Sequence, residues 1–100
     1  MLNHIVLFRR KADVAHQPGL ERDLVARMDA LGKQIGSIRS WKLSANELDR
    51  PICWGYVLES RCDDVNGLNE YLYHPLHQAL VADLKTYFEW AAVDYTEKAK

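Results

Sequence analysis

The sequence predicts an α+β fold built on one four-stranded antiparallel sheet, and three observations support this class. Its 100 residues leave room for a single domain, residues 1–100. Short runs rich in β-branched and aromatic residues alternate with stretches whose apolar residues recur every three or four positions. These patterns follow one another in the order strand, helix, strand, strand, helix, strand. That order is the ferredoxin-like β-α-β-β-α-β arrangement, in which the helices cover one face of the sheet.

The first half of the chain supplies three of the strands. Residues 4–8 form a short run that is rich in β-branched and aromatic residues and followed by charge, which is typical of a strand. Pro18 can open the next helix, whose apolar stripe consists of Leu20, Leu24, Met28, Leu31 and Ile35. We expect Gly36 to end this helix. Residues 38–43 are the second predicted strand, and residues 53–59 return as the third after a turn region.

The second half of the chain contains a helix that we expect to be broken. Asp63 or Asp64 can cap its first part, which carries Val65, Leu68 and Leu72. A residue before proline is driven out of the helical region, so His74 should end this part. Pro75 suits the first position of the next helix, which we expect to run to about Phe88. Residues 90–95 form the last predicted strand, and residues 97–100 a polar tail.

Composition and charge exclude several classes of partner. The net charge is -1, and the single basic run, residues 9–11, is typical of a solvated strand end. Because phosphate binding requires a clustered basic excess, we expect no nucleic-acid partner. No apolar stretch has the length of a membrane span, and we find no secretory signal, so we expect a cytoplasmic protein without a membrane partner. Cys53 and Cys62 lack the spacing of a zinc or redox pair and should be reduced thiols.

Strand alternation predicts that both faces of the sheet are apolar. In the first strand Ile5 and Leu7 point to one face, and Val6 and Phe8 to the other. The third strand repeats this pattern, with Trp54, Tyr56 and Leu58 opposite Cys53 and Val57. Helices can cover only one face, and each large side chain buried on the other contributes about 1.5–3 kcal/mol. The simplest cover is a second copy of the sheet, so we expect a homodimer whose two sheets close into a barrel-like core.

Residues 70–77 carry two imidazoles and two phenols in one short span. On the third helix His77 falls in the arc of the apolar residues Leu80, Val81, Leu84 and Phe88, so it should face the sheet. Tyr71 lies on the flank of the preceding apolar stripe, so its ring can be buried with its hydroxyl at the edge of a cavity between the helices and the sheet. Burial keeps an imidazole neutral, as a general base must be, and a neighbouring phenol can support an enolate. The alternative is that a bond between these two side chains only locks the broken helix.

The other histidines and the aromatic residues have weaker assignments. We expect His74 to cap a helix end or meet solvent, whereas His4 lines either the same cavity or the dimer core. Imidazoles suit zinc or copper, but without nearby carboxylates or thiolates we expect no metal site from these histidines. The large aromatic residues are typical of a core: Trp41, Trp54, Tyr56 and Trp90.

Several motifs together resemble the stress-responsive A/B barrel domain (Dabb) family over nearly the whole chain. They are the opening residues 4–8, Gly55-Tyr56, the junction Tyr71…His74-Pro75…His77, and Val93-Asp94-Tyr95. The resemblance implies a dimeric α+β barrel. Some plant members of the family cyclise a linear polyketide, and others are stress-stable proteins. In the cyclising members a tyrosine and the second histidine of His-Pro-x-His act in the acid–base step.

By position, the resemblance assigns those roles to Tyr71 and His77 and matches the strand-one histidine to His4. We therefore take Tyr71 and His77 as candidate catalytic residues, and His4, His74 and Tyr56 as candidate binding residues for a small-molecule ligand, without a cofactor. Three functions stay open. They are a cofactor-free, cyclase-like lyase or isomerase; a non-catalytic stress-related or structural dimer; and, by fold analogy alone, a cofactor-independent monooxygenase.

Overall fold

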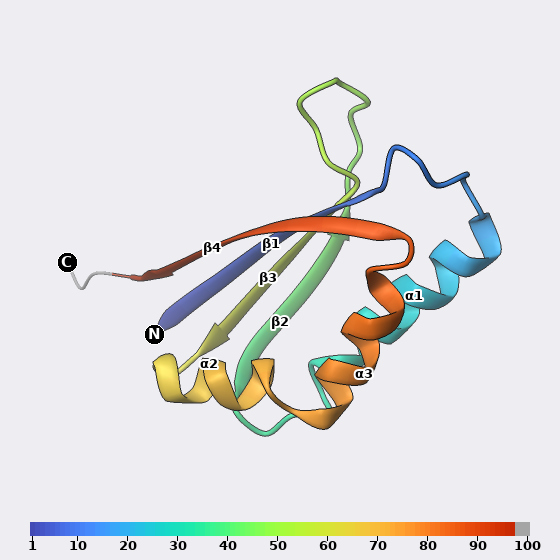
Figure 1. Ribbon diagram of the computed structural model, residues 1–100. Coiled ribbons are helices and arrows are strands. Elements are labelled where there is room, and N and C mark those ends of the chain that lie inside the picture. Colours follow the sequence, from blue (N-terminus) through green and yellow to red (C-terminus); the bar gives the residue numbers. More distant parts are fainter. Residues whose placement is uncertain (98–100) are drawn as a thin grey trace.

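A computed structural model describes residues 1–97 of the chain. Its elements are β1 (Leu2–Arg10), α1 (Pro18–Leu31), β2 (Ile38–Ala45), β3 (Tyr56–Cys62), α2 (Val65–Leu72), α3 (Pro75–Leu84) and β4 (Phe88–Thr96). The strands form one antiparallel sheet in the order β2-β3-β1-β4, with the helices on one side (Figure 1). The predicted ferredoxin-like α+β fold with a broken second helix is therefore confirmed. The predicted tail at residues 98–100 lies outside the described residues.

The break between α2 and α3 has the predicted local chemistry. His74 has an extended backbone (φ -63°, ψ 137°), and its ring accepts a hydrogen bond from the backbone N–H of Leu76 at 3.1 Å. Pro75 takes the first helical position, where its missing N–H is not needed. At the start of α2, Asp64 rather than Asp63 is the cap, and its carboxylate accepts from the N–H of Gly67 at 3.0 Å.

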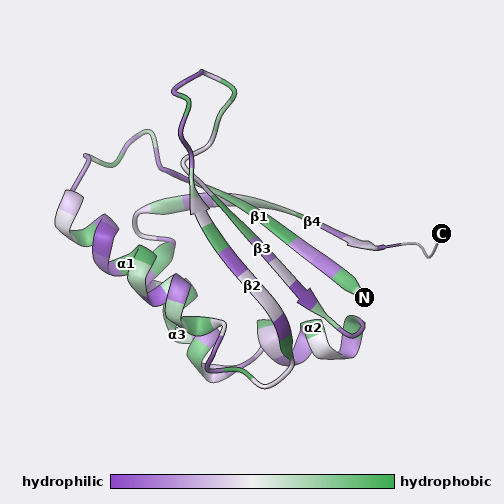
Figure 2. Cartoon of the chain, turned by 180° about the vertical axis from the view of Figure 1, so that it is seen from behind, coloured by the Kyte–Doolittle hydropathy of each residue, from purple (hydrophilic) through white to green (hydrophobic). Residues whose placement is uncertain are grey.

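Helix α1 ends earlier than predicted, at Leu31 instead of before Gly36. The residue after its last helical position, Gly32, packs against Trp41. A Cβ atom at position 32 would lie 2.2 Å from Cγ of Trp41, so only glycine allows the indole to approach here. The chain leaves the helix at this point, and Ile35 is buried in the following turn. Hydrophobic and hydrophilic residues alternate along α1 (Figure 2).

The third strand is displaced from its prediction, because it runs from Tyr56 to Cys62 and not over residues 53–59. Residues 46–55 instead form a projecting connection between β2 and β3, which we call the arm (Figure 1). Trp54 belongs to this arm, and the guanidinium of Arg9 lies 4.0 Å from the centre of its ring. Helix α3 also ends early, at Leu84, because Phe88 pairs with Arg10 as the first residue of β4.

The two faces of the sheet have different surroundings. On the helix side, β1 contributes His4, Val6 and Phe8, which are buried against the helices. The opposite side, which we call the open face, carries a central apolar group: Ile5, Leu7, Val57, Ala91 and Val93. Several of these are exposed, Val93 by 63%. Both faces are thus apolar, as the alternation predicts. Within residues 1–97, no helix combines the length and the hydropathy needed to cross a membrane.

Candidate functional site

Tyr71 and His77 meet across the junction between α2 and α3. Their ring centres lie 4.8 Å apart, with the planes at 77° in an edge-to-face contact. The Nδ1 atom of His77 is 2.7 Å from the carbonyl oxygen of Leu72. Because a carbonyl oxygen only accepts hydrogen bonds, Nδ1 carries the proton and donates it. In the neutral ring, Nε2 then keeps a free lone pair.

The surroundings set the charge state of both side chains. Burial lowers the pKa of His77 below its ordinary value, and this outweighs the opposing effect of the hydrogen bond to Leu72. Burial raises the pKa of Tyr71 well above its ordinary value, with smaller contributions from Cys62 and Asp94. At neutral pH the imidazole is therefore uncharged and the phenol keeps its proton. A neutral base lies beside a hydrogen-bond donor.

His4 joins this pair from the sheet. It is buried on the helix side of β1, and its ring centre lies 5.6 Å from that of Tyr71. Of the two places left open by the sequence, the structure selects the side of Tyr71 and not the open face. The Nδ1 atom of His4 is hydrogen-bonded to the carboxylate of Asp94, its direct partner across β1 and β4.

Asp94 is a site residue that our sequence reasoning did not single out. We expected no carboxylate close to the histidines, and the contact with His4 corrects that expectation. The pairing joins residues 90 positions apart and depends on the register between β1 and β4. Strand alternation alone does not supply that register. Among residues 1–97, no group of three or more histidine, cysteine or acidic side chains is arranged to hold a metal ion.

Two of the candidate binding residues have other contacts. The ring of His74 is at the junction, where it caps α3. Tyr56 is not brought to Tyr71 and His77, since it pairs with Phe8, four positions along β1 from His4, or roughly 13 Å. Its hydroxyl donates to Glu21 at 2.6 Å, and burial together with this bond raises the pKa of Tyr56 to about 12.

One strip of the helix side stays uncovered next to His4. The helices pack on β1, β2 and β3. The β4 residues Trp90, Ala92 and Asp94 face the same side as Phe8, Val6 and His4, yet all three are exposed. The side chain of Asp94 is 45% exposed, and the ring of Trp90 contacts that of Phe8 at 5.8 Å. The carboxylate of Asp94 is therefore exposed along β4, whereas its partner His4 is buried.

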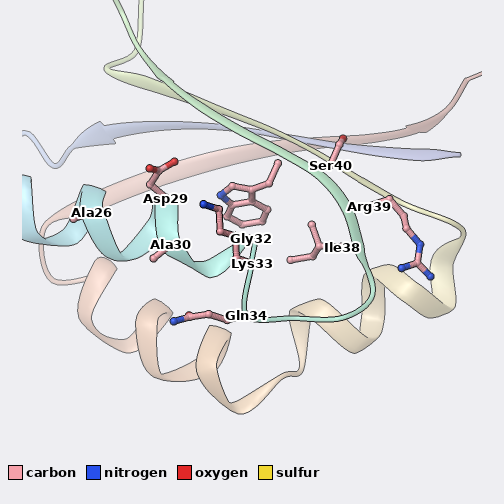
Figure 3. A pocket seen from close by; sticks show the side chains of 10 residues that line it. Ala26, Asp29, Ala30, Gly32, Lys33, Gln34, Ile38, Arg39 and Ser40 are labelled. Atoms are coloured by element: carbon pink, nitrogen blue, oxygen red, sulfur yellow. The ribbon is translucent and has the colours of Figure 1, made fainter.

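A cavity of about 820 Å³ lies on the other side of the site, between the end of α1 and the start of β2 (Figure 3). Trp41 forms part of its wall and donates its indole N–H to the carbonyl oxygen of Met28 at 3.1 Å. The same ring lies 5.5 Å from Tyr71 in an edge-to-face contact. Trp41 therefore stands between this cavity and the Tyr71–His77 pair. The sequence predicted a hollow where that pair meets, but this cavity lies beyond the indole.

Comparisons with known proteins agree with this architecture. Residues 2–97 match the family described as Stress responsive A/B Barrel Domain (Dabb). The chain is 37% identical over 95 residues to the uncharacterized protein SCO4036 of Streptomyces coelicolor, and the match covers 95% of this chain and 98% of that protein.

Two solved structures extend the likeness. A dimeric protein of unknown function with a ferredoxin-like fold from Bacteroides fragilis is 26% identical, with a TM-score of 0.74. It covers 94% of this chain and 93% of its own. The hydroxynitrile lyase of Passiflora edulis is 16% identical, with a TM-score of 0.82 over 99% and 94% of the two chains, and shares the fold. With the family match over residues 2–97 and the observed sheet and helices, this chain belongs to the stress-responsive A/B barrel domain family.

Proposed function

We propose that this protein is a homodimer that binds a small aromatic or apolar carbonyl compound between its helices and its sheet, where Tyr71 and His77 perform acid–base chemistry. The observation that carries this proposal is the 2.7 Å contact between Nδ1 of His77 and the carbonyl oxygen of Leu72. It leaves Nε2 as the basic atom of a neutral, half-buried imidazole beside a phenol.

The reaction that suits this arrangement is removal of a proton from the carbon next to a carbonyl group. Nε2 of His77 takes the proton, and the electron pair of the broken C–H bond forms the enolate. The Tyr71 hydroxyl then donates a hydrogen bond to the enolate oxygen. Return of the proton from the imidazolium to another atom of the substrate completes an isomerisation, or a cyclisation when the enolate carbon has attacked a second carbonyl. His4, which is hydrogen-bonded to Asp94, contacts the ring of Tyr71 from the sheet and orients it.

Two findings support the assembly and the type of chemistry. The similar protein from Bacteroides fragilis is described as dimeric, and the apolar open face offers a surface for a second copy. The Passiflora edulis protein is described as a hydroxynitrile lyase, so this fold carries a lyase activity in another chain. The likeness to that lyase is one of fold, and the proposed roles rest on the residues of this chain.

Proton exchange into a simple probe tests the proposal. We expect the protein to accelerate deuterium exchange of the methyl group of acetophenone in D2O, followed by proton NMR. The variants His77→Ala and Tyr71→Phe should each lower the protein-dependent rate about 100-fold, since general acid–base catalysis contributes about 10²–10⁴-fold. Matched controls are His16→Ala and Tyr73→Phe, whose exposed side chains lie outside the site and should leave the rate unchanged.

The other outcomes identify the competing functions. If the wild-type protein does not accelerate exchange and both site variants only lower thermal stability, the pair has a structural role in a non-catalytic dimer. Oxygen consumption with a phenolic substrate, lost in His77→Ala, would instead indicate a cofactor-independent monooxygenase. Equal rates in wild type and His77→Ala would exclude His77 as the base.

A further inference from the structure

We infer that the arm, residues 46–55, packs against the second copy of this chain, at the far end of that copy's open face. We call this the arm contact. This inference rests on the proposed homodimer and adds a second contact region to it. It assigns a function to the most exposed apolar side chains of the β2–β3 connection, which the Tyr71–His77 site does not use.

The arm is ordered yet presents apolar side chains to solvent. The N–H of Asn46 donates to the carbonyl oxygen of Gly55 at 2.8 Å, and the N–H of Gly55 donates to that of Phe8, also at 2.8 Å. Toward the tip, the N–H of Cys53 donates to the carbonyl oxygen of Arg50 at 2.9 Å. Ile52, near the tip, is 79% exposed, the highest value among the large hydrophobic side chains of residues 1–97. Leu48 is 65% exposed.

The arm bends toward the open face and not toward the helices. Arg9 lies on the open face, and its guanidinium packs 4.0 Å from the ring centre of Trp54 in the arm. A hollow of about 550 Å³ has Leu7 and Val57 of the open face on one side, and Leu48 and Ile52 of the arm on the other. The apolar surface of the open face therefore continues onto the arm without interruption. A partner that covers the face also meets the arm.

The apolar part of the open face is small. Four strands about 4.8 Å apart, each contributing about seven residues at 3.3 Å, give the whole face a flat footprint on the order of 400 Å². The apolar group at the centre of the face is also flanked by charged residues, Lys42, Glu59 and Arg61. The arm adds apolar area beside Leu7 and Val57.

The opposite end of the open face is suited to receive this arm. A hollow of about 440 Å³ there is lined by Ile5 and Tyr95 and by polar and charged groups, which include two cations, Lys42 and Arg61, and two carboxylates, Glu59 and Glu97. The side-chain nitrogen of Asn3, which also lines this hollow, is buried without a hydrogen-bond partner among residues 1–97. The arm brings the carboxylates of Glu47 and Asp49, which accept from such donors.

These features select one arrangement of the two copies. A two-fold axis that runs across the strands, between the two sheets, reverses the strand direction of one copy relative to the other. The arm of each copy, at one end of its own open face, then meets the hollow at the far end of the partner's open face. An axis along the strands would instead bring the two arms together, with Glu47 and Asp49 facing their own copies.

Sedimentation equilibrium over a dilution series tests the arm contact. We expect Ile52→Asp to raise the dimer dissociation constant at least tenfold. Ile52 is exposed in the single chain, so the far-ultraviolet circular dichroism of the variant should be unchanged. The matched control is Val65→Asp, a 60% exposed apolar residue at the start of α2, away from the open face, which should leave the dissociation constant within twofold of wild type.

A double-mutant cycle tests where on the partner subunit the arm packs. If Ile52 contacts Tyr95 of the partner subunit, the double variant Ile52→Ala with Tyr95→Ala should weaken the dimer less than the product of the two single effects. If the effects of the two single variants on the dissociation constant simply multiply, the proposed position of the arm is wrong. A dimer whose dissociation constant does not respond to Ile52→Asp would overturn the arm contact but not the proposed dimer. A wild-type chain that stays monomeric throughout the series would overturn the proposed dimer as well.

Discussion

Glu21 is the residue that ties the first turn of α1 to the sheet. Its two carboxylate oxygens accept hydrogen bonds from the hydroxyls of Tyr56, at 2.6 Å, and Tyr87, at 2.7 Å. Burial alone would raise the pKa of Glu21, but these two bonds outweigh it and the pKa lies below its ordinary value. A carboxyl whose pKa is lowered on folding stabilises the native state above its unfolded pKa, and the effect is lost as the pH falls through the folded pKa.

This contact gives a pH-dependent prediction. We expect Tyr56→Phe to lower the free energy of unfolding by about 1–2 kcal/mol at pH 7, since it removes one bond to a partly buried carboxylate. The loss should shrink as the pH falls below the ordinary glutamate value of about 4.3, because the unfolded chain then gains a proton at Glu21 before the folded chain does. Urea unfolding at pH 7 and pH 3.5 measures both values. Tyr73→Phe, which removes an exposed hydroxyl, is the control, and an undiminished loss at pH 3.5 would contradict the assignment.

A side chain of the site was predictable when local structure alone sets its position. The inward orientation of His77 follows from the helical period over a few residues, and His74 as a cap follows from the proline after it. The contacts of His4 with Asp94 and of Tyr56 with Glu21 join distant parts of the chain. They depend on strand register and on how α1 crosses the sheet, which residue types alone do not specify.

At the scale of elements, the end of α1 depends on one glycine. Gly32→Ala should lower the free energy of unfolding by about 1–3 kcal/mol, because the new methyl group would overlap the base of the Trp41 ring. Gly19→Ala is the matched control inside the same helix. Nothing lies within 4 Å of a Cβ atom at position 19, so this variant should be stabilised by up to about 1 kcal/mol. Chemical denaturation measures both, and equal effects of the two variants would contradict this packing.

Element order was predictable from the sequence, while several boundaries were not. The apolar run that begins at Cys53 continues the alternation of β3 backward, so the pattern carries no sign of where pairing begins. Pairing begins at Tyr56 because Phe8 is its partner on β1. The contact of Gly32, at the end of α1, with the indole of Trp41 is likewise absent from the local pattern, because the two residues lie nine positions apart.

For the whole molecule, strand alternation predicts a second copy over the open face. Val93 lies midway along the edge strand β4, opposite Ile5, and is 63% exposed. We expect Val93→Asp to make the protein monomeric at 10 μM, because a carboxylate there would be buried against apolar residues of the second copy. Sedimentation velocity measures this. A Val93→Asp protein that sediments as the wild type does would show that the open face is not the interface.

The alternation of apolar residues predicts that a second copy covers the sheet, but it contains nothing about the angle between the copies. That angle depends on shape, on the arm and on the charged residues around Arg61, all of which require the folded chain. In the same way, the sequence indicates that Tyr71 and His77 meet. It does not indicate that β4 leaves an exposed strip beside them.

Nitrogen-15 NMR of the histidine rings over a pH titration tests whether His77 offers a free Nε2 atom as a neutral base beside Tyr71. We expect the neutral ring of His77 to carry its proton on Nδ1 and its titration midpoint to lie below the ordinary histidine value of about 6.5. A neutral ring protonated on Nε2, or a midpoint at or above that value, would show that His77 is not the base.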